Sequence, residues 1–217
     1  KESSAASDVY KRQAWDGFKP FKITHIEQVT HNIKAFTVTS ETQDLSQFVP
    51  GQYITVDIES ERLPYRAKRH YSIVDGGKDF LTFGVRHEVS DTHEGEVSTV
   101  LHEEFKEGDT ILLSAPVGGF KVHHSEKPQL FIGSGVGVTP LVSMYRQVVE
   151  SQGTAQMIHV AATENDVAFK DTLEALTAKS SHAHLHLHIK DKEGYLEADE
   201  LKTYLTDCLL YTSDAAD

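Results

Sequence analysis

Cysteine, basic charge and long apolar runs are all scarce in this 217-residue chain. Cys208 is its only cysteine, so a disulfide within the chain is excluded. No apolar stretch approaches the roughly 20 residues that a membrane-spanning helix needs, and no segment near the start has the apolar core of a signal peptide. We therefore expect no membrane partner and a cytoplasmic location.

Basic residues are outnumbered by acidic ones, with 21 Lys and Arg against 33 Asp and Glu and a formal net charge of −12. An acidic chain repels phosphate backbones, so we expect no nucleic-acid partner. The hydrophobic share of 39% and the charged share of 25% are typical of a globular protein. The length suits one large domain or two small ones.

Both ends of the chain carry an unusual pattern, at residues 3–13 and 208–217. DNA strings that encode these two segments can be written as reverse complements of one another over their shared length. They also match an adapter used in transposase-based sequencing libraries. We therefore interpret 1–13 and 208–217 as translated adapter and exclude them from fold prediction, as one excludes a fusion scar. The alternative is a disordered tail at each end.

Short alternating runs of apolar and polar residues dominate the segment 14–125 and predict β-strands separated by Gly and Pro turns. The predicted strands lie at 21–24, 33–38, 53–58, 80–85 and 110–114. One amphipathic helix interrupts them at 97–105. Many short strands with turn signals between them predict an antiparallel barrel or sandwich.

The segment 126–207 alternates instead between strands and helices. Its predicted strands and helices lie at 129–132, 140–150, 157–162, 167–178, 185–189 and 197–205. This alternation predicts a parallel sheet built from βαβ units. Only three strands precede residue 208, whereas a doubly wound nucleotide domain usually has five or six, so we predict that this domain is truncated at its C-terminal side.

The strongest local motif is a glycine-rich segment between a predicted strand and a predicted helix. It comprises Gly133, Ser134, Gly135, Val136, Gly137, Val138, Thr139 and Pro140. Glycine permits the positive φ and the close backbone approach of a phosphate-binding turn. Thr139 suits the N-cap and Pro140 the first helical turn, where free amides would bind a pyrophosphate. The spacing differs from the usual G-x-G-x-x-G, and a plain glycine-rich turn is the alternative.

Two further segments carry candidate binding residues. The first, at the end of a predicted strand, comprises Arg69, His70, Tyr71 and Ser72. The guanidinium of Arg69 can bind a phosphate through two parallel hydrogen bonds. The ring of Tyr71 offers a flat surface to another aromatic system. The second comprises Gly95, Glu96, Val97 and Ser98 and opens the helix at 97–105. Ser98 could cap that helix, whose N-terminus would hold an anion, although capping without a ligand is equally compatible.

In this order and with this spacing, the three segments resemble the ferredoxin-reductase-like flavoproteins. Finer features at 15–21, 50–53 and 114–120 resemble the reductase part of flavohemoglobins. The resemblance covers essentially all of 14–207. It implies an antiparallel β-barrel domain that binds FAD at 14–125, followed by a truncated α/β domain with a parallel sheet that binds NADH or NADPH at 126–207.

The resemblance also implies roles for individual residues. Arg69 contacts the FAD pyrophosphate, Tyr71 lies along the isoalloxazine ring and Ser72 approaches its N5 edge, so Tyr71 and Ser72 are the catalytic candidates. The implied FAD-binding set is Tyr53, Arg69, His70, Tyr71, Ser72, Gly95, Val97 and Ser98, and the glycine-rich segment holds the nicotinamide dinucleotide. Arg86 stands where flavohemoglobins often carry a Lys that tunes the flavin.

The resemblance further implies the direction of electron flow. Hydride passes from the nicotinamide to flavin N5, and electrons then reach a haem that turns nitric oxide and oxygen into nitrate. That haem belongs to a globin domain expected before residue 14 and missing here. Two alternatives stay open, a stand-alone reductase that feeds a separate iron–sulfur protein or oxygenase, and a non-enzymatic nucleotide-binding regulator. Glu164 favours NADH, because a carboxylate bonds a ribose hydroxyl and repels a 2′-phosphate.

Four alternating histidines, His182, His184, His186 and His188, share one face of a predicted strand. A metal site needs converging ligands whose nitrogens are oriented by further partners. A polar face at the edge of a sheet explains the row more simply, so we expect no metal.

Overall fold

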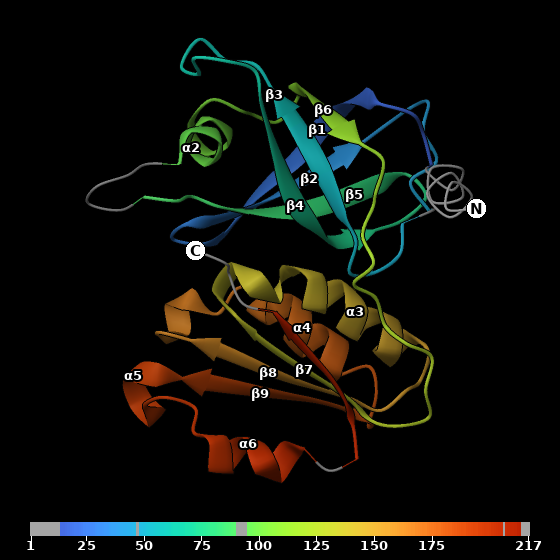
Figure 1. The fold of residues 1–217 in the computed structure, drawn as a ribbon, viewed down its shortest axis with the longest axis vertical. Helices are drawn as coiled ribbons and strands as arrows, with labels where there is room; N and C mark the ends of the chain where they lie inside the picture. The colour runs from blue at the N-terminus through green and yellow to red at the C-terminus, as the bar shows by residue number, and fades with distance from the viewer. Residues whose placement is uncertain (1–13, 47, 90–94, 206, 214–217) are drawn as a thin grey trace, which may run out of the picture.

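The computed structural model describes residues 14–46, 48–89, 95–205 and 207–213, and the segment 1–13 that we interpret as adapter lies outside them. Two domains follow one another along the long axis of the molecule, the first a closed barrel and the second a four-stranded sheet with helices (Figure 1). The predicted fold class, an antiparallel barrel followed by a parallel α/β domain, is confirmed. Within the described ranges, every helix is too short or too polar to cross a bilayer.

Six strands form the barrel, in the order β1-β2-β5-β4-β3-β6, and all neighbours are antiparallel. They are β1 (Phe18–Thr30), β2 (Ile33–Thr39), β3 (Tyr53–Ile58), β4 (Ala67–Gly76), β5 (Phe80–Arg86) and β6 (Thr110–Ser114). Alternate side chains point inward, and the stacked rings of Phe36 and Phe83, with centroids 5.6 Å apart, lie in this core. Helix α2 (Glu96–Glu103) packs against the same core through Val97, Val100 and Leu101.

The second domain has four parallel strands in the order β10-β7-β8-β9. They are β7 (Gln129–Ser134), β8 (Ala155–Ala161), β9 (Ala183–Ile189) and β10 (Leu209–Ser213). The helical segments between them are η1 (Gly135–Gly137), α3 (Val138–Glu150), η2 (Glu164–Asp166), α4 (Lys170–Thr177), α5 (Lys190–Glu193) and α6 (Ala198–Tyr204). The three strands predicted before residue 208 are present. Strand β10 lies in the segment that we interpret as adapter, an origin that stays a prediction for the encoding DNA to test.

Helix α4 begins three residues later than predicted. The sequence pattern placed its start at residue 167, but Phe169 adopts a left-handed backbone with φ of 58° and the helix begins at Lys170. Val167 and Phe169 are nevertheless buried. Their apolar character therefore reflects packing in the loop before the helix, which a periodic pattern cannot distinguish from a helical turn.

The outer wall of the barrel packs directly on α3, which lies between the barrel and the sheet (Figure 1). Two polar contacts join the barrel to α3. The Gly51 amide donates to Ser143 Oγ at 3.1 Å, and Arg146 pairs with Asp75 at 2.9 Å. A Cβ on Gly51 would lie 2.3 Å from the Phe120 carbonyl oxygen, so only glycine permits this approach. The two domains therefore meet through a packed interface.

Candidate functional site

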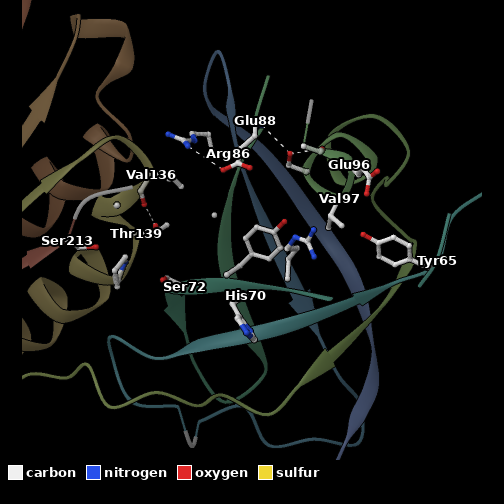
Figure 2. A pocket seen from close by; sticks show the side chains of 17 residues that line it. Tyr65, His70, Ser72, Arg86, Glu88, Glu96, Val97, Val136, Thr139 and Ser213 are labelled. Carbon is white, nitrogen blue, oxygen red and sulfur yellow. Dashed lines mark hydrogen bonds and ion pairs between the residues drawn. The ribbon is translucent and has the colours of Figure 1, made fainter. Parts of the chain in front are cut away.

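A cleft of about 700 Å³ opens between the barrel and the second domain (Figure 2). Eleven of the predicted site residues line it: Arg69, His70, Tyr71, Ser72, Gly95, Val97, Ser98, Val136, Gly137, Thr139 and Pro140. The segments around Tyr71 and Val136, far apart in the sequence, thus face one shared cavity. Five predicted residues lie outside its lining: Tyr53, Gly133, Ser134, Gly135 and Val138.

Strand β4 supplies the barrel wall of the cleft. The four predicted residues lie inside this strand and not at its end, because β4 continues through a register shift between Ile73 and Asp75. Tyr71 stacks on Phe83 with ring centroids 5.9 Å apart. Burial raises the pKa of Tyr71, so its hydroxyl stays protonated and can donate a hydrogen bond at neutral pH.

Tyr53 lies on the strand next to the wall of the cleft. It is the ladder partner of Ser72 on the neighbouring strand β3. Its ring is tilted against the ring of His70, with centroids 4.9 Å apart. The other side of His70 is held by Thr55, whose Oγ1 lies 2.9 Å from His70 Nδ1. In the structure Tyr53 therefore supports a residue of the cleft and does not line the cleft itself.

The start of α2 forms the upper end of the cleft as Figure 2 shows it. The N-cap is Gly95, and Ser98 lies within the first turn, so Ser98 is not the cap that we predicted. Its Oγ donates to the Gly95 carbonyl at 2.9 Å and accepts from the Glu88 amide at 3.2 Å. The first-turn amides have no acceptor within the helix and are available to an anion. A Cβ on Gly95 would lie 2.7 Å from Ser98 Oγ and 2.9 Å from Glu88 Cβ, so glycine is required.

The glycine-rich turn forms the opposite wall. Here η1 precedes α3, whose N-cap is Gly137. Thr139 is therefore inside the first turn instead of at the N-cap, and its hydroxyl donates to the Val136 carbonyl. Gly133 lies under the helix, where a Cβ would come within 2.9 Å of Leu141 Cδ1. Gly133 thus sets the distance between strand and helix, and Gly137 lines the cleft.

Six further residues line the cleft: Tyr65, Gly84, Arg86, Glu88, Glu96 and Ser213. Glu96 lies inside the predicted segment 95–98, and Arg86 stands at the position where the resemblance places a flavin-tuning Lys. The other four residues were not predicted. Arg86 Nη2 lies 3.3 Å from Glu88 Oε1, so a cation and an anion are paired at this edge (Figure 2). Of these residues, Gly84 could have been predicted from the sequence, because an isolated glycine inside a strand often marks a close approach of another backbone.

The lining fits a flavin and a second dinucleotide. An aromatic ring forms one wall, and two helix N-termini supply amides to phosphate groups. The guanidinium of Arg69 is exposed, and its Nη1 donates to the Lys68 carbonyl at 2.9 Å. Among the described residues no ion pair of Arg69 with an acid occurs, which leaves its charge for an anionic ligand.

Comparison with known proteins agrees with this arrangement. Residues 20–122 match the family model of the oxidoreductase FAD-binding domain, and residues 131–214 match that of the oxidoreductase NAD-binding domain. A flavohemoprotein of Bacillus cereus is 35% identical over 214 residues, which cover 90% of this chain and 53% of the relative. A flavohemoprotein of Pseudomonas putida is 28% identical over 211 residues, with 94% and 53% covered. The chain thus spans about half the length of the curated relatives it matches.

Two solved structures share the fold. The flavohem-like FAD/NAD binding domain of nitric oxide dioxygenase from Vibrio cholerae superposes with a TM-score of 0.81 at 23% identity, covering 91% of this chain and 87% of that one. A flavohemoglobin from Malassezia yamatoensis with bound FAD and heme gives a TM-score of 0.80 at 15% identity, covering 95% and 55%.

The chain thus combines an oxidoreductase FAD-binding domain with an oxidoreductase NAD-binding domain, and its cofactors are FAD and NAD(P)H. Within this class it is similar to the reductase portion of flavohemoproteins, which confirms the resemblance read from the sequence. The two alternatives, a stand-alone reductase that feeds a separate iron–sulfur protein or oxygenase and a non-enzymatic nucleotide-binding regulator, are not favoured.

Proposed function

We propose that this reductase passes electrons from NAD(P)H through FAD to a haem in a globin domain of the same full-length protein. The observation that carries the proposal is the shared cleft, which Tyr71 and Ser72 of the barrel line together with Val136 and Gly137 of the glycine-rich turn. Figure 2 shows Ser72 and Val136 on the two sides of this cleft. FAD, when bound, accepts a hydride from the nicotinamide and releases its electrons singly. The curated flavohemoproteins support a haem as the acceptor.

The residues of the chain bind and align the two cofactors. Tyr71, held against Phe83, would offer a flat surface to the flavin rings of bound FAD, and its protonated hydroxyl would be available there as a hydrogen-bond donor. Arg69 and the first-turn amides of α2 bind the FAD pyrophosphate. The amides at Val136 and Gly137 hold the second dinucleotide. Such alignment of two reactants accounts for most of the gain that a protein adds to cofactor chemistry.

We infer NADH as the preferred donor. Glu164 begins η2, shortly after β8, and we expect its carboxylate to bond a ribose hydroxyl and to repel a 2′-phosphate. It pairs with Lys192 Nζ at 2.6 Å, so a bound ribose has to displace the lysine. The preference is tested by the ratio of kcat/KM for NADH to that for NADPH, which Glu164→Gln is expected to lower.

For the whole protein we propose conversion of nitric oxide and oxygen to nitrate in the cytoplasm. Support comes from the flavohemoprotein relatives and from the nitric oxide dioxygenase domain that shares the fold. A globin domain that precedes residue 14 in the gene would hold the haem and receive the electrons.

The test has two stages. The chain is purified with FAD, and anaerobic NADH is added in a stopped-flow instrument, where the yellow flavin absorbance should bleach within one turnover. The full-length gene product is then reduced in the same way, and the visible bands of its haem should shift to the ferrous form after the flavin bleaches. If the protein is still colourless after incubation with excess FAD and removal of the unbound flavin, the result contradicts the reductase. A bleached flavin without any haem in the gene product contradicts only the acceptor.

A further inference from the structure

Two histidines of β9 lie beside two acids from the helices that follow the strand. His188 Nδ1 lies 3.8 Å from Glu193 Oε2 and 3.7 Å from Glu200 Oε1. His186 Nε2 lies 4.0 Å from Glu200 Oε1. We propose that these four side chains form a binding site for a transition-metal dication, with zinc as the preferred ion. The site lies on the far side of the second domain from the barrel, where α5 and α6 flank β9 (Figure 1).

Unpaired nitrogen atoms point independently to a ligand at this place. The side chain of His188 is only 1% exposed, yet its Nδ1 has no hydrogen-bond partner. His186 Nε2 is likewise buried and without a partner. Buried polar atoms are almost always satisfied in folded proteins, so two adjacent orphaned nitrogens require an explanation. One dication between them would accept both lone pairs.

The second nitrogen of His188 is already used in the way that metal sites use it. His188 Nε2 lies 3.0 Å from the carbonyl oxygen of Gly194, which can only accept. Nε2 therefore carries the proton and donates, and in the neutral ring Nδ1 keeps its lone pair toward the acids. Metal-binding histidines commonly donate their other N–H to a backbone carbonyl, which fixes the tautomer and the ring orientation.

Glu193 is oriented in the same manner. Its Oε1 accepts from the Ile189 amide at 2.8 Å, which leaves Oε2 directed at His188. The ring of Tyr204 lies against His186, with centroids 5.7 Å apart, and restricts the orientation of that imidazole. Three of the four proposed ligands are thus held by contacts outside the site, as expected of a preformed metal site.

The spacing of the ligand atoms suits a small four-coordinate ion. Bonds of about 2.0–2.1 Å at tetrahedral angles place ligand atoms about 3.3 Å apart. Ligand atoms of His186, His188 and Glu193 lie within 4.8 Å of one another, and Glu200 lies at 3.7–4.0 Å from the two rings. The two acids are 41% and 39% exposed, so they can close on an ion that enters from solvent. Two imidazoles with two carboxylates favour zinc over magnesium or calcium, which take oxygen ligands.

This assignment revises the expectation of no metal. The sequence shows a row of four histidines, but His182 and His184 are exposed and take no part in the cluster. The two acids of the site lie in α5 and α6. Their distance from the histidines therefore depends on how the chain folds back against β9 after that strand ends. An ion at this point would tie α6 to β9, which lies at one end of the described sheet.

The test uses the full chain, stripped of metal and titrated with zinc in competition with a chromophoric chelator. We expect one tightly bound equivalent and an increase in the thermal unfolding midpoint on its addition. His186→Gln and Glu200→Gln should each weaken binding by roughly 10-fold or more. His184→Gln and Glu197→Gln remove an exposed histidine and an exposed acid nearby and should leave the affinity within about twofold. Cobalt should give the intense visible bands of tetrahedral coordination, and Glu200→Gln should abolish them.

Two results would overturn the assignment. One is the absence of zinc binding to the metal-free protein. The other is zinc binding of unchanged affinity in both His186→Gln and Glu200→Gln, which would place the ion on other histidines. Far-UV circular dichroism and FAD content identify any variant that fails to fold, and the cobalt spectrum of the wild type reports coordination independently of the variants.

Discussion

Gly84 of β5 faces Thr139 of α3 across the joint of the two domains, and a Cβ on Gly84 would lie only 2.6 Å from Thr139 Cγ2. Thr139 has little freedom to move, because its hydroxyl is bonded to the Val136 carbonyl and its side chain is buried. The ring of Phe169 lies 3.4 Å from the same point. The wall of the barrel thus reaches the glycine-rich turn only because one strand residue lacks a side chain.

Gly84→Ala is expected to slow the NADH-dependent reduction of bound FAD by about 10- to 100-fold. The added methyl group pushes α3 and its preceding turn away from the barrel, and a displacement of about 1 Å between two reacting partners has an effect of this size. FAD content should stay near that of the wild type, because β4 and α2 are not displaced. Single-turnover stopped-flow absorbance measures the rate.

A second substitution separates this clash from general damage. Thr139→Ser removes Cγ2 and keeps the hydroxyl, so the double variant Gly84→Ala with Thr139→Ser should recover most of the lost rate. Thr139→Ser alone should reduce FAD at nearly the wild-type rate. Equal rates in the double variant and in Gly84→Ala would show that the contact with Thr139 does not determine the geometry of the cleft.

Arg69→Ala is expected to weaken FAD binding by roughly 10- to 100-fold, because charge-assisted hydrogen bonds to a phosphate contribute about 1.5–3 kcal/mol. Arg69→Lys should recover only part of the affinity, since an ammonium cannot bind two phosphate oxygens in parallel. Arg62→Ala is the matched control, because Arg62 pairs with Glu103 outside the cleft. Titration of the apoprotein with FAD, followed by flavin fluorescence, gives the dissociation constants.

The elements of the fold were readable from the sequence because their signals are local. The alternation of apolar and polar residues predicted the barrel strands. The glycine-rich turn between β7 and α3 predicted the nucleotide-binding side of the cleft. Helix starts were less accurate, since Ser98 and Thr139 were expected as caps but lie in first turns that begin at glycine N-caps. The prediction relied on the side chains that are preferred at N-caps. In both helices the backbone conformation of a glycine, and not a capping side chain, marks the N-cap.

The parts of the site that were missed depend on contacts that no local sequence pattern encodes. Glu88 enters the cleft because its backbone bonds Gly95 and Ser98, which no spacing in the sequence reveals. Tyr53 was expected to contact FAD, which stays a prediction; strand pairing sets it beside Ser72 and against the ring of His70, outside the lining of the cleft. Pattern and motif therefore predicted which segments meet, whereas the side chains that reach the cavity follow from register and closure of the barrel.

Asp75→Asn is expected to lower the free energy of unfolding by about 1 kcal/mol, near the upper end for a partly exposed ion pair. Its carboxylate lies 2.9 Å from Arg146 Nη2, and the two side chains are 30% and 23% exposed. Loss of the charge leaves the guanidinium with Glu150, whose Oε1 is 3.8 Å from Nη1. Glu150→Gln, at that longer distance, should lower the stability by less than half as much. Urea denaturation at low and high salt checks both values, and an effect of Asp75→Asn that salt leaves unchanged would argue against an ionic contribution.

His159, at the centre of β8, should make the protein less stable in mild acid. Its side chain is fully buried, neither ring nitrogen has a hydrogen-bond partner, and burial lowers its pKa from 6.5 to about 4. The folded state therefore binds fewer protons than the unfolded state between these two values. Stability contributed by the neutral ring is complete above pH 6.5, falls as the pH decreases toward 4, and changes no further below that value.

Between pH 7.5 and pH 5 this effect corresponds to about 2 kcal/mol of unfolding free energy, since one pKa unit is worth about 1.4 kcal/mol. His159→Leu has a similar volume and no titrating group, so its unfolding free energy should fall by about 2 kcal/mol less than that of the wild type over the same interval. His182→Gln, which alters an exposed histidine, should keep the wild-type dependence. Urea denaturation at the two pH values measures the difference. Parallel pH profiles for His159→Leu and the wild type would mean that His159 already has a proton acceptor or a path to solvent, and that its burial does not control the acid sensitivity of the second domain.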